Sequence, residues 1–149
     1  MSRYGEKKNL EVTILSGDRD TFQLATDKVT IRIPHTKGGK TETDLYNKEK
    51  IIEKYGIEPQ QLIDVKGLQG DTSDNIPGAP GVGPKTASAI IQKYHSVDNV
   101  LAHLDELKPP KAQKSITENA EQVKMSRFLA EININVPLDY NCLLYTSDA

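Results

Sequence analysis

The stretch from Leu68 to Thr86, LQGDTSDNIPGAPGVGPKT, constrains the fold and the chemistry of this chain more than any other. Its second half interleaves prolines, which fix φ and remove a backbone donor, with glycines, which permit positive φ. Such a loop is held in one shape with its backbone amides exposed. Two aspartates, Asp71 and Asp74, stand directly before it. Carboxylates beside a rigid loop of this kind predict a metal site next to a phosphate-binding site.

Composition bounds the class of protein. The chain of 149 residues is long enough for one domain, but an apolar share of 36% indicates a marginal core or a piece of a larger unit. The net charge of −2 does not indicate a nucleic-acid binder, although the segment from Ile76 to His95 holds Lys85 and Lys93 and no acid. The single cysteine excludes an internal disulfide and a cysteine-only zinc site. Because no apolar run approaches the ~20 residues that span a bilayer, we expect a cytoplasmic protein without a membrane partner.

Hydrophobic patterning predicts a piece of α/β sheet followed by a helical cluster. The expected strands are Leu10–Leu15, Val29–Ile33, which Pro34 should stop, and a short return strand over Thr41–Tyr46 after a flexible turn at 35–40. The expected helices are 48–55 with Asn47 as its cap, 60–68, 85–94, a turn capped by Ser96, and 109–131 with a break near Asn119. A short helical turn is expected over 21–25, and the tail of a helix before residue 10.

Four aspartates are candidate metal ligands: Asp18 and Asp20 just after the first strand, and the pair Asp71 and Asp74. Open α/β sheets form their sites at the carboxyl ends of strands, and the second pair would share a face if residues 70–75 formed a helical turn. Mg²⁺ prefers oxygen ligands, and two ions ~3.5–4 Å apart can clamp the attacking and leaving oxygens of a phosphodiester cleavage. The alternative is that these aspartates only form turns or cap helices. The acids that we interpret as solvated or capping are Asp64, Asp98, Asp105 and Asp139.

The glycine-rich loop allows three interpretations. It approximates the nucleotide-binding pattern G-x-x-x-x-G-K-T, but Pro84 separates Gly83 from Lys85 and no strand precedes the loop. It could be a plain structural turn between two helices. Alternatively, it is a hairpin whose amides bind a DNA phosphate at the start of the following helix, with Lys85 and Lys93 adding a salt-dependent attraction.

Three motifs together point to a family. The first is Gly17-Asp18-Arg19-Asp20, the second is GDTSDNIPG from Gly70 to Gly78, and the third is PGVGPKTA from Pro80 to Ala87. With these motifs at this spacing, the chain from about Leu10 to Asn141 resembles the bacterial 5′–3′ exonuclease domain. That domain is the N-terminal part of DNA polymerase I and a relative of flap endonucleases.

The resemblance implies a partial PIN-like α/β sheet followed by a helix–three-turn–helix, a DNA-binding region of the helix-hairpin-helix type. It implies catalysis by two Mg²⁺ or Mn²⁺ ions, with Asp18 and Asp20 as strand-end ligands and Asp71 and Asp74 helping to hold the second ion. Relatives often bind K⁺ at the hairpin that contacts the duplex backbone. The expected DNA-binding residues are Gly78, Gly81, Val82, Gly83, Lys85, Thr86 and Lys93.

By the same resemblance, the substrate is a 5′ flap or nicked duplex in Okazaki-fragment processing and DNA repair, and the product carries a 5′-phosphate. The implied partners are this DNA and the polymerase domain of the same parent chain, and we expect a monomer in the bacterial cytoplasm. The expected domains are 1–46 as the end of the nuclease core, 47–141 as the DNA-binding region, and a non-family tail over 142–149.

The chain departs from the family at its start, because the family's first-strand aspartate, basic arch and acidic cluster would lie before Met1. We therefore expect this chain alone to bind duplex DNA weakly and to cleave it poorly or not at all, which a flap-cleavage assay with Mg²⁺ tests. Two other classes are a non-catalytic duplex-binding module and a generic structural domain. The clustered carboxylates favour the nuclease, because crowding them without metal raises their pKa values and destabilises the fold.

Overall fold

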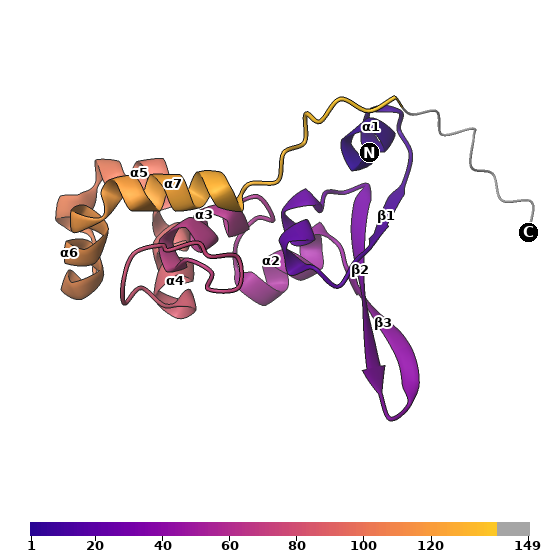
Figure 1. The fold of residues 1–149 in the computed structure, drawn as a ribbon, viewed down its shortest axis with the longest axis horizontal. Coiled ribbons are helices and arrows are strands. Elements are labelled where there is room, and N and C mark those ends of the chain that lie inside the picture. Colours follow the sequence, from indigo (N-terminus) through magenta and orange to yellow (C-terminus); the bar gives the residue numbers. More distant parts are fainter. Residues whose placement is uncertain (140–149) are drawn as a thin grey trace, which may run out of the picture.

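The computed structural model describes residues 1–139 as an α/β part joined to a cluster of helices (Figure 1). The α/β part contains α1 (Ser2–Lys7), β1 (Val12–Leu15), η1 (Arg19–Leu24), β2 (Val29–Lys37) and β3 (Lys40–Tyr46). The helices are α2 (Lys48–Tyr55), α3 (Gln61–Gln69), α4 (Pro84–Tyr94), α5 (Val97–Ala102), η2 (Leu104–Glu106), α6 (Pro110–Glu118) and α7 (Ala120–Ala130). The mixed α/β class predicted from the sequence is confirmed. The predicted tail over 142–149 lies outside the described residues.

The sheet has the order β1-β2-β3, with β1 parallel to β2 and β2 antiparallel to β3. The prediction that Pro34 stops the second strand is wrong, because β2 continues to Lys37. Its pairing with β1 ends at Arg32, so beyond that point β2 has one free edge, where a proline is tolerated. The turn is only Gly38-Gly39, both with positive φ, as a tight hairpin requires. Figure 1 shows this hairpin projecting away from the body.

The helical pattern agrees closely with the expectation. Asn47 caps α2 by accepting the amide of Lys50, and the left-handed Gly56 ends that helix. Ser96 caps α5, and the predicted break is the Asn119 junction between α6 and α7. Among residues 1–139, no helix combines the length and the apolar character needed to cross a membrane.

Two apolar cores meet at the centre of the molecule. The larger core lies among the helices, and its fully buried members include Leu68, Ile91, Val97, Val100, Ile116 and Val123. The smaller core packs the sheet on η1 and α2 through Phe22, Val29, Ile31, Tyr46 and Ile51. Tyr55 and Leu62 are packed against both cores, so the two parts share one joint rather than a loose linker.

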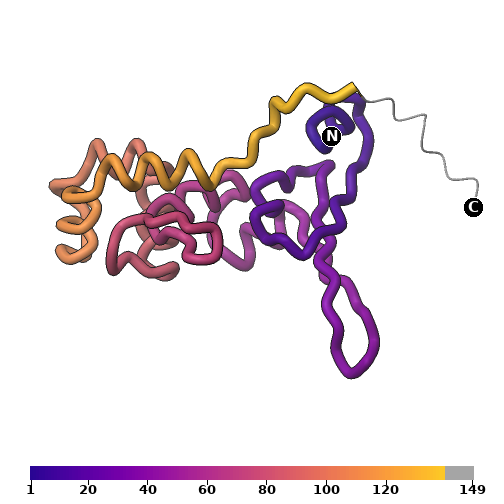
Figure 2. The backbone as a smooth tube through the Cα atoms, in the orientation of Figure 1, coloured from indigo at the N-terminus to yellow at the C-terminus, as the bar shows by residue number. Residues whose placement is uncertain are grey.

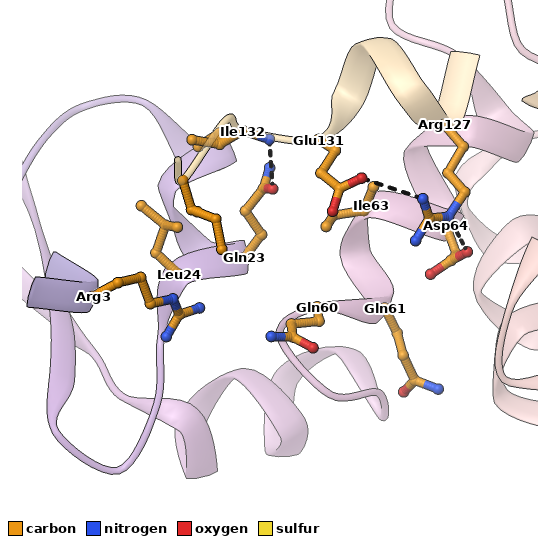
Figure 3. Close-up of a pocket in the computed structure, with 11 residues that line it drawn as sticks. Arg3, Gln23, Leu24, Gln60, Gln61, Ile63, Asp64, Arg127, Glu131 and Ile132 are labelled. Carbon is orange, nitrogen blue, oxygen red and sulfur yellow. Dashed lines mark hydrogen bonds and ion pairs between the residues drawn. The ribbon is translucent and has the colours of Figure 1, made fainter. Parts of the chain in front are cut away.

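The buried carboxamide of Gln23 also connects the α/β part to the helical cluster (Figure 3). Gln23 of η1 donates to the carbonyl of Ala130 at 3.0 Å and accepts the amide of Ile132 at 2.9 Å. The chain after α7 then runs back toward α1, as Figure 2 shows, and Ile134 and Arg3 line one pocket of about 260 Å³. Gln23 therefore ties the end of the helical cluster to the α/β part.

Asp64, which was expected to be either solvated or capping, has the capping role. It is only 5% exposed, and its Oδ1 accepts both the amide of Val97, at the start of α5, and Nε of Arg127, each at 2.9 Å. Arg127 also pairs with Glu131 at 3.4 Å (Figure 3). Asp64 thus caps a helix that is distant in sequence and joins α3, α5 and α7.

The close approach of α3 and α7 predicts the effect of Gly67→Ala. A Cβ at Gly67 would lie 2.8 Å from Cβ and 3.0 Å from Cα of Arg127, so α7 would have to shift. Alanine normally stabilises a helix interior, yet here we expect a loss of about 2 kcal/mol in the free energy of unfolding, measured with urea. Gly17→Ala is the matched control, because no atom lies within 4 Å of its Cβ. A Gly67→Ala variant as stable as the parent would contradict the close contact.

Removing Arg127 should leave the buried Asp64 without its counter-charge. We expect Arg127→Met to lower the free energy of unfolding by about 3 kcal/mol. Lys124→Met removes the same charge from the same helix but breaks only an exposed pair with Glu121, so its loss should stay below about 1 kcal/mol. Equal losses of unfolding free energy in the two variants, measured in the same urea experiment, would mean that the buried Arg127–Asp64 pair stabilises the fold no more than an exposed pair does.

Candidate functional site

Asp18 and Asp20 follow the end of β1, as the sequence predicts, but their side chains make different contacts. Asp18 is the N-cap of η1, and its Oδ1 accepts the amide of Asp20 at 2.8 Å. Oδ1 of Asp18 therefore has a local partner, and Asp18 lies outside the acidic trio described below. Asp20 lies one residue inside η1 and is partly buried against α3.

Asp71 and Asp74 lie in a turn that follows α3. The sequence analysis considered a helical turn over residues 70–75, but this turn is not helical. It is closed by two backbone hydrogen bonds between Asp71 and Ile76, of 2.7 and 2.8 Å. Asp71 Oδ1 accepts the amide of Ser73 at 2.8 Å, which is the turn-forming role of Asp. Gly70, at φ 74°, is required here, because a Cβ would lie 2.6 Å from the carbonyl oxygens of Ile76 and Pro77.

The structure brings three of the four candidate aspartates together. One carboxylate oxygen from each of Asp20, Asp71 and Asp74 lies within 4.8 Å of the others. We call these residues the acidic trio. Asp20 and Asp71 line a pocket of about 270 Å³ that also contains Arg19 and Gln69. Gln69 also lines this pocket, and its Oε1 is buried without a hydrogen-bond partner.

Lys66, which was not among the site residues predicted from the sequence, lies at the centre of the acidic trio. Its Nζ is 2.6 and 2.7 Å from the two oxygens of Asp20, 2.9 Å from Asp71 Oδ2 and 2.7 Å from Asp74 Oδ2. Only 11% of its side chain is exposed. The available signal was its place in the predicted 60–68 helix, one turn after the inward-facing Leu62 and just before the acidic turn.

The electrostatics of the site follow from this crowding. Burial raises the pKa of Asp20, and the charges of Asp18 and Asp74 add to the effect, while Lys66 offsets part of it. The hydrogen bond from Ser73, followed by the contact with Lys66, holds the pKa of Asp71 well below its usual range. Burial opposes the charge on Lys66, but the three carboxylates outweigh it and raise the pKa of that ammonium. Lys66 and Asp71 therefore stabilise each other in their charged forms.

The glycine hairpin from Gly78 to Lys85 is anchored by the helices around it. Ser126 of α7 accepts the amide of Gly78 at 2.9 Å, and Gln122 donates to its carbonyl at 2.8 Å. Ser115 of α6 donates to the carbonyl of Pro80 at 2.6 Å. Ala79 and Val82 are buried in the helical core, so the exposed tips Gly81 and Gly83 are presented in a fixed shape.

Helix α4 starts directly from this hairpin with Pro84 as its first residue and Gly83 as its N-cap, which offers no side-chain acceptor. A groove of about 420 Å³ runs beside α4 and is lined by Lys85, Thr86, Lys93 and Lys108, among others, with no acid. Within residues 1–139, none of these lysines has a carboxylate within 4.0 Å. Lys85, Thr86 and Lys93 were predicted from the sequence to bind DNA. Lys108 was not predicted, because it comes to the groove from the loop before α6.

Comparisons with known proteins agree with this architecture. Residues 57–147 match the family model described as the 5′–3′ exonuclease, C-terminal SAM fold. DNA polymerase I of Bacillus subtilis is 44% identical over 139 residues, which is 93% of this chain and 16% of that relative. A 5′–3′ exonuclease of the same organism is 42% identical over 128 residues, 86% of this chain and 42% of that protein.

The fold also matches a solved structure of the bacteriophage T5 flap endonuclease, a pseudo-enzyme–product complex with DNA and metal ions. The TM-score is 0.69 at 21% identity, over 87% of this chain and 47% of that chain. The chain thus spans less than half the length of these relatives. Since the family model covers more than half of its residues, the chain belongs to the 5′–3′ exonuclease family.

Proposed function

We propose that this chain forms part of a structure-specific 5′–3′ exonuclease and flap endonuclease. In this proposal it contributes the DNA-binding region over 47–141 and, from 1–46, the end of the nuclease core. The observation that carries the proposal is the acidic trio, converging from two distant segments beside a rigid, amide-presenting hairpin. A module that only bound DNA would gain nothing from three carboxylates next to the phosphates of its ligand.

The donor set fits a hard divalent cation such as Mg²⁺ or Mn²⁺. It consists of carboxylate oxygens, with the unpartnered Gln69 Oε1 in the same pocket, and it holds no sulfur or imidazole ligand among the described residues. Bound ions would supply charge neutralisation on the phosphodiester and a hydroxide-like nucleophile. We propose that Asp20, Asp71 and Asp74 hold the ion and that Asp18 contributes through its second oxygen, because the cap of η1 uses only Oδ1.

The hairpin has the second task, which is to hold the duplex backbone. Gly81, Val82 and Gly83 present backbone groups, and the N-terminus of α4 favours an anion. Such contacts fix the register of the duplex without reading its sequence. We propose that Lys85 and Lys93 add charge along the groove, that Thr86 and Gly78 complete the surface, and that K⁺ binds at the hairpin, as the resemblance implies.

The trio and the hairpin are mechanically linked. A Cβ at Gly78 would lie 2.2 Å from the amide nitrogen of Gly70, so the start of the acidic turn and the start of the hairpin touch back to back. This backbone contact fixes the distance between the proposed metal site and the proposed DNA-binding hairpin. In this proposal the substrate is a 5′ flap or nicked duplex, within a DNA polymerase I chain that processes Okazaki fragments and repairs DNA.

The metal centre is tested by Asp71→Asn. We expect Mn²⁺ binding to the chain, measured by isothermal titration calorimetry, to weaken by more than about tenfold, because one charged ligand becomes neutral. Asp105→Asn, an exposed acid in η2, should bind Mn²⁺ as the parent does. In a longer chain that carries this segment, the same substitution should abolish flap cleavage and leave duplex binding intact. Loss of duplex binding together with cleavage would mean that Asp71 supports DNA binding or the fold rather than the metal.

The hairpin is tested by Lys85→Ala. We expect weaker binding to a duplex, measured by fluorescence anisotropy, and a slope of log K against log salt that falls by about 0.9, the value for one phosphate contact. Lys48→Ala removes the same charge from α2, where Lys48 already pairs with Glu58 at 3.3 Å, and should leave that slope unchanged. An unaltered slope for Lys85→Ala would remove the phosphate-contact role.

A further inference from the structure

We propose that Lys66 is the built-in counter-cation of the acidic trio: it holds the three carboxylates together in the metal-free protein and is displaced when a divalent ion binds. This inference rests on the metal centre proposed above. It assigns a role to a residue outside the ligand set, and it concerns the protein before the metal arrives.

The first support is the convergence of the contacts. Nζ of Lys66 lies between 2.6 and 2.9 Å from oxygens of all three members of the trio. An ammonium has three donors, so these contacts can use its whole hydrogen-bonding capacity. Asp20 comes from η1, whereas the other two acids come from the turn after α3. Lys66 is therefore a bridge between two segments whose carboxylates would otherwise repel each other.

The second support is geometric exclusion. A Mg²⁺ ion binds oxygen at ~2.0–2.1 Å, and an ion on the same three oxygens would lie within a few ångströms of Nζ. Two cations at that separation repel, and the carboxylate lone pairs that point at Lys66 would have to turn toward the ion. The ammonium and the ion are thus alternative partners of the trio.

The third support is that the lysine can leave. Its side chain is a flexible stem with a compact charge, which suits a reversible contact better than a planar guanidinium does. The pocket of about 270 Å³ that Lys66 lines gives the stem room to move. Arg19 lines the same pocket, yet it has no carboxylate within 4.0 Å among residues 1–139, so Lys66 alone of these two cations neutralises the trio.

This role predicts two effects of opposite sign. Without Lys66, the metal-free protein should be less stable, because the trio has lost its bridge. The same change should make Mn²⁺ bind more tightly, because the ion no longer competes with a tethered cation. A lysine that only packed against the pocket would lower stability without improving metal affinity, so the second effect separates the two roles.

The experiment compares Lys66→Met and Lys66→Arg with Arg19→Met, which removes one positive charge from the same pocket without breaking a contact to the trio. Thermal unfolding in EDTA and calorimetric titration with MnCl₂ at constant ionic strength are the two measurements. For Lys66→Met we expect a melting temperature lower by about 3–6 °C in EDTA and Mn²⁺ affinity higher by about tenfold. Lys66→Arg keeps the charge, so its melting temperature should stay near that of the parent and its Mn²⁺ affinity should not rise. Arg19→Met should change both quantities much less than Lys66→Met does.

Lys66→Gln, which keeps hydrogen bonds to the carboxylates without the charge, replaces Lys66→Met if the latter does not fold. The inference is overturned if the parent binds Mn²⁺ and the neutral variants bind it no more tightly, or if their melting temperatures in EDTA are unchanged. If the parent and every Lys66 variant fail to bind Mn²⁺, the proposed metal centre itself fails, and displacement of Lys66 fails with it. These two failures are distinguished by the titration of the parent protein alone.

Discussion

The structure depends on helix α3 lying against α7 at a distance that only glycine allows. Gly67 faces the backbone of Arg127, and α3 also contacts α4, α5 and η1. Asp64 joins α5 and α7, Lys66 joins the acidic trio, and the carbonyl of Leu68 accepts the amide of Ala79 in the hairpin at 2.7 Å. A shift of α3 would therefore disturb the core, the carboxylates and the hairpin together.

That arrangement explains how a short segment can carry two different sites. The acidic turn and the glycine hairpin follow one another in sequence, and the touching backbones of Gly70 and Gly78 hold them back to back. Side chains of α6 and α7 then fix the hairpin from behind through its carbonyl and amide groups. The exposed glycines are consequently rigid without side-chain contacts of their own, which leaves their backbone free to meet a ligand.

The class of fold and most helix limits could be predicted from the sequence, because they follow from periodicity and from capping residues. The meeting of Asp20 with Asp71 and Asp74 was implied by the family resemblance that the three motifs carry. The features that could not be predicted from the sequence depend on tertiary contacts. Asp64 looks like any helical surface acid until Arg127, 63 residues later, covers it. Pro34 would stop an interior strand, but β2 has a free edge at that point.

The net charge of the chain says less about its partners than the positions of its charged side chains do. A net charge of −2 would disfavour a polyanion as a partner. However, the negative charge of the trio is partly neutralised by Lys66, whereas the lysines beside α4 have no acidic partner among residues 1–139 and line a groove without acids. The groove beside α4 is therefore positive, whereas the three carboxylates of the trio converge on a single ammonium. Charges of opposite sign are thus separated into two sites, which the net charge of the whole chain does not reveal.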